Sequence, residues 1–309
     1  MHAHTPVLLD EVLDGLAIRP DGRYIDATFG RGGHSAAVLA RLSAQGELLA
    51  IDRDSSAVTA ARERFGADSR FTVIHGSFSQ LEQLVAQSGR GAGWDGVLLD
   101  LGVSSPQLDD AARGFSFMQD GPLDMRMNTA SGTTAAQWLA RVPERDLERV
   151  IRDYGEERFA RRIAHAIVEA RRTRPLDRTL VLAEVVSAAV PRREPGKHPA
   201  TRTFQAIRIH INDEFAEIEA ALRATLSLLK PGGRLCVISF HSLEDTLVKR
   251  FIQQHSQDDP VYAGLPDIPE HARARLKRVG RTIHPAEAEV ARNPRARSAV
   301  LRIAERRAA

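Results

Sequence analysis

The chain of 309 residues is 43% hydrophobic, so it can bury a full core and has room for one large domain with an insertion. It contains no run of about eighteen apolar residues and no basic and apolar leader at its start, so we expect a cytoplasmic protein without a membrane partner. Cys236 is the only cysteine, which excludes disulfides within the chain and argues against a cysteine-based zinc site.

The net charge of +3 conceals an uneven distribution along the chain. Residues 171–208 hold nine Arg or Lys against three acids, and residues 271–309 hold eleven against three, so these segments carry +6 and +8 and the remainder carries −11. Either segment alone is compatible with an ordinary solvated face. Two basic segments on an otherwise acidic chain favour a polyanionic partner, with RNA or DNA first in line.

The first motif in chain order follows a short amphipathic helix that we expect over residues 6–16. A predicted strand ends at Asp26, a turn with three glycines follows, and a helix is expected over 35–42. A dinucleotide fingerprint would need a glycine where this chain has Ser35, which weakens that interpretation. With Thr28 in place of the first glycine, the loop instead resembles that of class I S-adenosylmethionine-dependent methyltransferases. An ordinary β-to-α turn remains an alternative.

Two further predicted strands place acids where nucleotide-binding folds need them. The strand over 46–52 ends in Asp52, about twenty residues after the glycine turn, where doubly wound folds hold the ribose-binding carboxylate. Its alternative role is to cap the helix that we expect to begin near residue 55. The apolar run over 96–101 contains Asp100 near its end, at the edge of a parallel sheet where ligands bind. A buried acid that is merely hydrogen-bonded by the following loop is the alternative.

Between these strands lies a third, predicted over 71–76. Phe78 follows it in a strand-to-helix turn, where an adenine ring could stack on it, although the pattern alone favours a core position. Ser79 and Glu82 have the spacing of a capping box, which predicts the start of the next helix.

The fifth strand, predicted over 235–239, comes far later in the sequence. It follows a predicted helix over 204–229 and a stop at 230–234. About 130 residues therefore separate two strands that a crossover of a few tens would join. We expect an α/β doubly wound methyltransferase-like domain from residues 1–107 and 203–309, with a mostly helical insertion over 108–202 for substrate recognition. Helices are expected within 147–155, 159–170 and 179–190, before a basic loop over 192–202.

The segment after the fifth strand concentrates polar groups at 239–245. His241 is a candidate to donate to or accept from a substrate base, while Glu244 and Asp245 could merely cap the next helix. A metal site made of these three residues is poorly supported, and we predict none. The alternating sequence over 295–303 predicts a last strand at the sheet edge.

Taken together, several long motifs resemble the bacterial ribosomal RNA small subunit methyltransferase H (MraW-like) family. The matching runs extend from about residue 4 to residue 302 and lie at 4–9, 28–35, 100–107, 121–127, 196–205 and 239–245. The resemblance implies methyl transfer from S-adenosylmethionine to the exocyclic N4 of a cytosine in 16S ribosomal RNA, near the decoding centre.

The resemblance also implies roles for individual residues. The cofactor would be held by Gly32, Gly33, His34, Asp52, Phe78, Asp100 and Gln107. Of these, Gly32, Gly33 and His34 would hold the methionine end, Asp52 the ribose and Phe78 the adenine, with Asp100 and Gln107 completing the pocket. For Phe78 it reverses the preference for a core position, and His34 and Gln107 rest on it alone.

The chemistry itself is a separate hypothesis. A cytosine amine is a poor nucleophile, so acceptors must hold its N–H groups while the methyl group lies in line. We expect the loop around Ser104 and Ser105, with His241 opposite, to position the amine and accept its proton. The implied partner is 16S ribosomal RNA in the small subunit, and a homodimer is an oligomeric state left open. Two other functions remain: a methyltransferase of the same fold acting on DNA or a small molecule, and an RNA-binding assembly factor without turnover.

Overall fold

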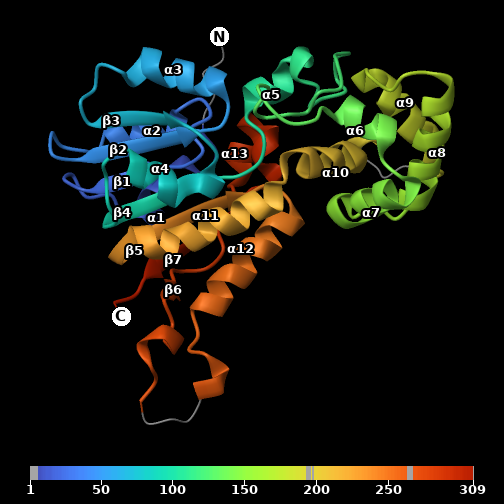
Figure 1. Cartoon of the computed structure of the whole chain (residues 1–309). Helices are drawn as coiled ribbons and strands as arrows, with labels where there is room; N and C mark the ends of the chain where they lie inside the picture. The colour runs from blue at the N-terminus through green and yellow to red at the C-terminus, as the bar shows by residue number, and fades with distance from the viewer. Residues whose placement is uncertain (1–5, 193–195, 197, 263–266, 309) are drawn as a thin grey trace. The chain divides into compact units, whose positions relative to one another are not determined.

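The computed structural model describes residues 6–192, 196, 198–262 and 267–308. The chain folds as two compact units, Met1–Gly102 with Phe215–Ala309, and Val103–Glu214 (Figure 1). The second unit is the inserted segment, for which the sequence predicted boundaries at 108 and 202. Parts of the predicted basic loop over 192–202 and of the motif that starts at residue 4 lie outside the described residues. Within the described ranges, no helix is long and apolar enough to cross a membrane.

The first unit is built on a seven-stranded sheet with the order β3-β2-β1-β4-β5-β7-β6. Its first five strands run parallel, and β7 runs antiparallel to both of its neighbours, β5 and β6. This order, with an antiparallel seventh strand, is that of class I methyltransferases. The strands are β1 Arg23–Asp26, β2 Glu47–Asp52, β3 Phe71–His75, β4 Trp94–Asp100, β5 Leu229–Ser239, β6 Leu276–Arg278 and β7 Val300–Arg306.

Both faces of this sheet are covered by helices, as the unbroken apolar runs predicted. Successive strand residues point to opposite faces, so Ile25 and Leu49 join one core cluster while their neighbours Tyr24 and Leu48 join the other. The first cluster includes side chains of α4 Leu81–Gln87, α11 Glu214–Leu228 and α12 Ser242–His255. The second includes side chains of α1 Leu9–Leu16, α2 Gly33–Leu39 and α3 Ser55–Phe65. Because β1 to β5 run parallel, their carboxyl ends lie at one common edge of the sheet.

The second unit is mostly helical and has its own core. Helix α10 packs on α7, α7 on α8, and α8 on α9. The helices are α5 Ser105–Asp109, α6 Ala135–Arg141, α7 Glu144–Gly155, α8 Ala160–Thr173, α9 Thr179–Ala189 and α10 Thr201–Asn212.

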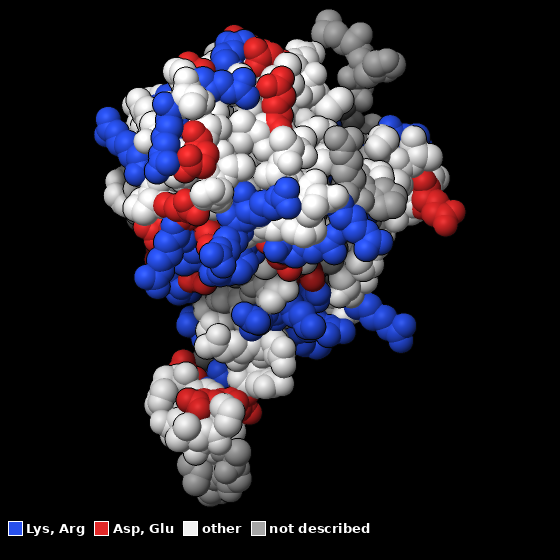
Figure 2. All heavy atoms as spheres, turned by 90° about the vertical axis from the view of Figure 1, so that its right-hand side faces the viewer, with Lys and Arg blue, Asp and Glu red and all other residues white. Residues whose placement is uncertain are grey.

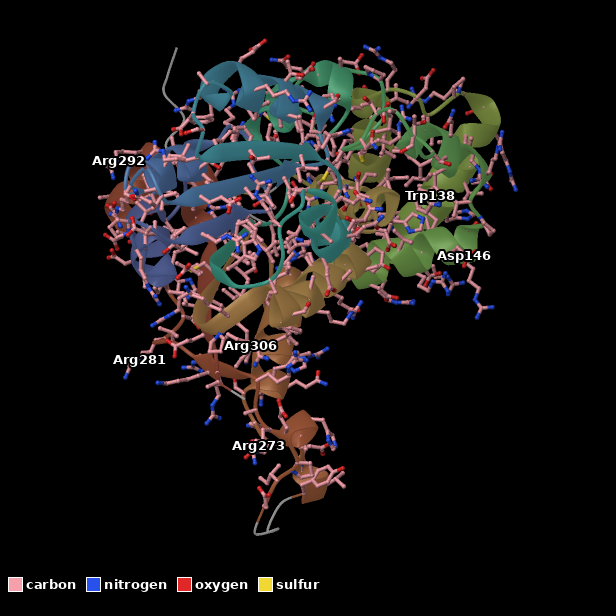
Figure 3. The ribbon with its side chains drawn as sticks, turned by 60° about the vertical axis from the view of Figure 1, so that its left-hand side comes forward. Trp138, Asp146, Arg273, Arg281, Arg292 and Arg306 are labelled. Atoms are coloured by element: carbon pink, nitrogen blue, oxygen red, sulfur yellow. The ribbon has the colours of Figure 1, made fainter. Side chains whose placement is uncertain are left out.

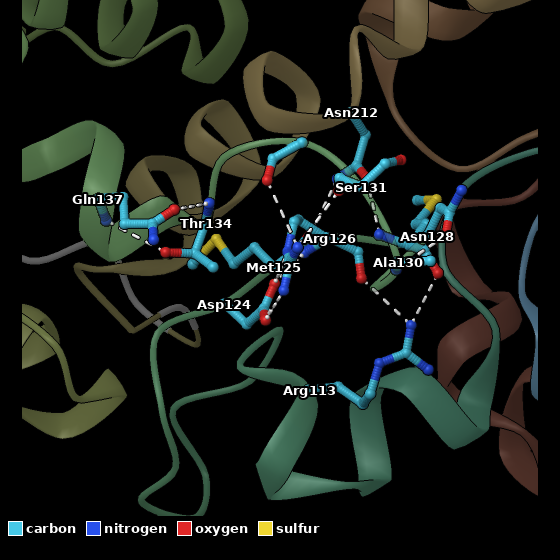
Figure 4. A network of polar contacts seen from close by, with 12 residues as sticks. Arg113, Asp124, Met125, Arg126, Asn128, Ala130, Ser131, Thr134, Gln137 and Asn212 are labelled. Carbon is cyan, nitrogen blue, oxygen red and sulfur yellow. Dashed lines mark hydrogen bonds and ion pairs between the residues drawn. The ribbon is translucent and has the colours of Figure 1, made fainter.

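A polar network fixes the non-helical segment before α6 (Figure 4). Arg126 donates to both oxygens of Asp124 at 2.7 and 2.8 Å, and Arg113 donates to the carbonyls of Arg126 and Met127. Asn212, at the end of α10, donates from Nδ2 to the Met125 carbonyl and accepts from the Met127 amide through Oδ1, both at 2.8 Å. The motif at 121–127 therefore has a structural role, because its backbone groups are paired by side chains instead of by a helix.

Four predicted elements differ clearly from those observed. The fifth strand begins at Leu229 and not at residue 235, so the predicted stop over 230–234 belongs to β5. The helix expected over 204–229 is two helices, α10 and α11, because Asp213 between them adopts a left-handed φ of 48° that ends α10. The strand expected from 295 begins only at Val300, since residues 294–298 form a 3₁₀ turn capped by Asn293. The capping box expected at Ser79 is absent, because the Ser77 side chain accepts from the Ser79 amide and opens a 3₁₀ turn before α4.

Candidate active site

Three acids lie at the carboxyl ends of three adjacent parallel strands. Asp26 ends β1, Asp52 ends β2 and Asp100 ends β4, and β1 is paired with both of the others. The sheet therefore brings together the two predicted site acids and the acid of the glycine loop at the edge where doubly wound folds bind ligands.

Asp26 holds the loop itself in place. Its carboxylate accepts from the Ser35 hydroxyl at 2.6 Å and from the Thr28 amide at 3.2 Å, and the residue is only 2% exposed. Burial raises the pKa of this carboxyl above its usual range, against the two hydrogen bonds. Asp26 therefore joins the end of β1 to the first turn of α2.

Asp52 is bonded to the backbone on both of its oxygens. Oδ2 accepts from the Gly30 amide and Oδ1 from the Asp54 amide, each at 2.8 Å. Burial raises the pKa of Asp52 to about 6 despite these bonds. The alternative role as a cap of α3 is wrong, because Asp54 is the N-cap and accepts from the Ser56 amide. Each oxygen of Asp52 keeps a lone pair for a further donor.

Asp100 is the acid with an unsatisfied oxygen. Its Oδ1 is buried and has no hydrogen-bond partner among the described residues, while its amide donates to the Thr28 hydroxyl at 2.7 Å. The side chain is 27% exposed, and Oδ2 lies 3.7 Å from Nδ1 of His34. Burial raises the pKa of Asp100 to about 6; the charge of His34 opposes this rise, and the carboxylates of Asp26 and Glu244 add to it. A buried acceptor of this kind calls for a donor, and the negative charge favours a cationic one.

His34 is held so that one ring nitrogen faces Asp100. Nε2 lies 3.0 Å from the Val7 carbonyl, and because a carbonyl can only accept, this nitrogen carries the proton. Nδ1, which carries no proton in the neutral ring, then faces the Asp100 carboxylate. The ring is 6% exposed, so its orientation is fixed by these partners.

The glycines of the loop are needed for backbone shape and for packing. Gly30 and Gly32 have left-handed φ values of 55° and 68°. A Cβ atom on Gly32 would lie 2.4 Å from the Phe29 ring, and one on Gly33 would lie 2.3 Å from Pro6. Neighbouring side chains thus explain both Gly32 and Gly33 without any ligand, while Gly30 supplies an amide to the bridge with Asp52.

Two predicted residues of the first unit have clear structural roles. Phe78 lies in the 3₁₀ turn before α4, partly buried and packed against the core, as its pattern indicated. His241 is the N-cap of α12, where its Nδ1 is 3.4 Å from the Glu244 amide, and its Nε2 lies 3.1 Å from Oε1 of the same residue. The predicted caps were therefore misassigned: Glu244 instead accepts from the Phe240 amide, and Asp245 is paired with Arg302 at 2.7 and 2.8 Å.

The remaining predicted residues belong to the second unit. Ser104 and Gln107 form a capping box at the start of α5, in which the Gln107 side-chain oxygen accepts from the Ser104 amide at 3.0 Å. Gln107 is 5% exposed, and Ser105 is the first residue of the helix. The Ser-x-x-Gln spacing that signals such a box is present in the sequence and was overlooked.

The residues of the first unit fit S-adenosylmethionine. The unsatisfied oxygen of Asp100 suits the ammonium group of the methionine end, and the lone pairs of Asp52 suit the two ribose hydroxyls. Both acids bear a charge opposite to that of a sulfonium cofactor.

Comparison with known proteins identifies the family. The family model for the MraW methylase family matches residues 1–307. Among solved structures, an rRNA methylase from Streptococcus thermophilus is 12% identical over 99% of this chain and 100% of that chain, with a TM-score of 0.43. TrmN from Thermus thermophilus is 13% identical over 97% of this chain and 48% of that one (TM-score 0.44). An O-methyltransferase from Thermotoga maritima is 12% identical over 100% of this chain and 69% of that chain, with a TM-score of 0.42. Likenesses at this level assign no function. The family match does: the chain belongs to the MraW methylase family and is an S-adenosylmethionine-dependent methyltransferase.

Proposed function

We propose that this protein methylates the exocyclic N4 of a cytidine in 16S ribosomal RNA, near the decoding centre of the small subunit, and that it does so in the cytoplasm. Membership of the MraW methylase family supports ribosomal RNA as the substrate. The observation that supports cofactor binding is the pair of acids Asp52 and Asp100, and above all the buried oxygen of Asp100 that has no hydrogen-bond partner among the described residues.

In this proposal each residue of the sheet edge has a defined task. Asp100 accepts from the cofactor ammonium, and Nδ1 of His34 lies beside its carboxylate at 3.7 Å. Asp52 accepts from the ribose hydroxyls. The backbone at Gly32 and Gly33 lies along the methionine end, while Phe78 and Gln107 border the adenine and the rest of the pocket.

The reaction is a direct displacement. When bound, S-adenosylmethionine supplies a methyl group on a positively charged sulfur. The N4 lone pair forms the new C–N bond, the C–S bond breaks with its electrons going to sulfur, and N4 then loses one proton. We assign the positioning of the amine to Ser104 and Ser105 and the acceptance of the proton to His241. Because Nδ1 of the neutral ring accepts from the Glu244 amide, Nε2 carries the proton, and His241 would take the proton of the amine at Nδ1. The Nε2–H of the resulting imidazolium would lie 3.1 Å from Oε1 of the fully buried Glu244, whose charge would stabilise it.

The inserted unit carries a surface suited to RNA. The exposed arginines Arg158, Arg161 and Arg162 line a cavity of about 470 Å³ at the start of α8, beside Phe159 and the paired side chains of Glu144 and His165. The Arg158 guanidinium lies 4.5 Å from the Phe159 ring centroid. Lys and Arg side chains gather on the face shown in Figure 2. Arginines bind phosphates and an aromatic ring can stack on a base, so we propose that this unit recognises the substrate RNA.

The test is methyl transfer to small ribosomal subunits purified from cells that lack this protein, followed by nucleoside analysis. Label is expected in N4-methylcytidine and should be lost with Asp52→Ala or Asp100→Ala. The matched control is Asp14→Ala, which removes an acid that is 83% exposed on α1. Cofactor binding without transfer would favour an RNA-binding assembly factor instead. An unchanged rate in the Ser105→Ala, His241→Ala double variant would remove both residues from the mechanism.

A further inference from the structure

The first unit contains a cavity of about 490 Å³ away from the three acids. It lies between the carboxyl-terminal half of α12, the loop after β6, and β7. Its lining includes the cations Lys249, Arg278, Arg281 and Arg302 and contains no acid. The whole chain has nearly equal numbers of basic and acidic residues, 43 and 40, so a cavity lined by four cations and no carboxylate marks a local preference for anions.

Three of these cations are not neutralised. Lys249 and Arg281 are exposed, and Arg278 donates only to the Gly280 carbonyl, at 3.1 Å. None of the three has an ion-pair partner among the described residues. Figure 3 shows Arg281 on the loop that follows β6, projecting away from the ribbon.

The fourth cation and its surroundings make the cavity a built site. Arg302 is fixed by Asp245 through two bonds and donates to the Thr282 hydroxyl at 3.1 Å. The Ser256 hydroxyl, which also lines the cavity, is buried without a hydrogen-bond partner among the described residues. A hydroxyl that can donate and three unneutralised cations together suit the oxygens of a phosphate group.

We propose that this cavity binds phosphodiester groups of the substrate RNA, a few nucleotides from the base that is methylated. The inference rests on the proposed function for the identity of the RNA. Residues Lys249 to Ser256 lie about 10 to 20 Å along α12 from its start beside His241, at about 1.5 Å per residue. With a phosphate about every 3.4 Å along a stacked strand, this distance spans roughly three to six phosphates. One strand can therefore reach both places.

The experiment measures binding of the full chain to small ribosomal subunits from cells lacking this protein, over a range of salt concentrations. The test variant is the double substitution Lys249→Ala, Arg281→Ala. The matched controls are Arg250→Ala, the exposed neighbour on α12, and Lys277→Ala, the neighbour of Arg278 on β6; neither control residue lines the cavity. Melting curves and S-adenosylmethionine affinity should be unchanged in all variants.

The loss of two phosphate contacts should make the negative slope of log affinity against log salt shallower by about 1.4. Near physiological salt this corresponds to a loss of affinity for the subunits on the order of tenfold. The controls should lose clearly less. An affinity and slope equal to those of the native protein would overturn the inference and leave the proposed methylation untouched. An equal loss in the controls would also overturn it, because the effect would then be general surface charge.

Two further outcomes separate the alternatives. If inorganic phosphate binds the native protein but not the double variant, while subunit binding is unchanged, the cavity takes free anions and the RNA proposal is wrong. If the double variant binds subunits more weakly but the native protein transfers no methyl group to them, the RNA contact stands and the proposed reaction fails.

Discussion

Replacing Asp100 by asparagine should stabilise the cofactor-free protein while it abolishes cofactor binding. The pKa of Asp100 is about 6, compared with 3.8 for an unhindered aspartate. A shift of about two units corresponds to about 3 kcal/mol of unfavourable free energy in the ionised form. Because the side chain is 27% exposed, water offsets part of this cost, and we expect a gain of about 1 to 3 kcal/mol.

The sign of the pH dependence follows from proton binding. Between pH values of about 4 and 6, the folded protein holds a proton on Asp100 that the unfolded chain has released. The free energy of unfolding therefore falls as pH rises through this window, and the full cost is present above it. Asparagine does not titrate, so the advantage of the variant should be complete at about pH 8 and should disappear near pH 4.

Amide hydrogen exchange of β1 and β4 is the suitable assay, because it reports the unit that holds Asp100 separately from the inserted unit. Denaturant titrations at the same pH values give the overall free energy, and calorimetry gives the cofactor affinity. The control Asp14→Asn, at a largely exposed site, should change neither the free energy of unfolding nor the cofactor affinity. A variant that is less stable than the native protein at about pH 8, or a difference that does not vary with pH, would refute the reasoning.

Three further outcomes are expected. The affinity for S-adenosylmethionine should fall as pH drops below about 6, because Asp52 and Asp100 take up protons there, and a flat calorimetric profile from about pH 5 to 8 would contradict this. Gly32→Ala should cost at least about 1 kcal/mol more than Gly89→Ala in denaturant titrations, since both glycines have left-handed φ but only Gly32 lacks space for a Cβ; equal costs would disprove the packing role. Thr28→Val should cost about 1 to 3 kcal/mol and weaken cofactor binding, because the amide of Asp100 loses its acceptor, and an unchanged affinity would show that this bond is dispensable.

The strands and their terminal acids were predictable because one physical rule produces both signals. A central parallel strand is buried on both faces, so it appears as an apolar run, and an acid at its end stands out. Asp52 and Asp100 were found in this way. The insertion was predictable for a related reason, since too many residues separate β4 from β5 for one crossover.

The features that the sequence did not predict depend on contacts between residues that are far apart in the chain. Apolar spacing continues through Asp213, so the pattern gives no sign that this residue adopts a left-handed conformation and ends a helix. The partner of His34 is the Val7 carbonyl, which no spacing rule connects to it. The unsatisfied oxygen of Asp100 is likewise a property of the packed site and not of any motif.

The three acids at the sheet edge differ in what they have left to offer a ligand, although the sequence pattern makes them equivalent. Asp26 is bonded within its own loop and is 2% exposed, so it shapes the site without reaching into it. Asp52 is oriented by two amides, which leaves it lone pairs for neutral donors such as hydroxyls. Asp100 has an oxygen with no donor, and its charge is made less favourable by that of Asp26. A cation bound beside Asp100 would offset this charge, and we therefore propose that the cofactor ammonium binds at Asp100 and the ribose at Asp52.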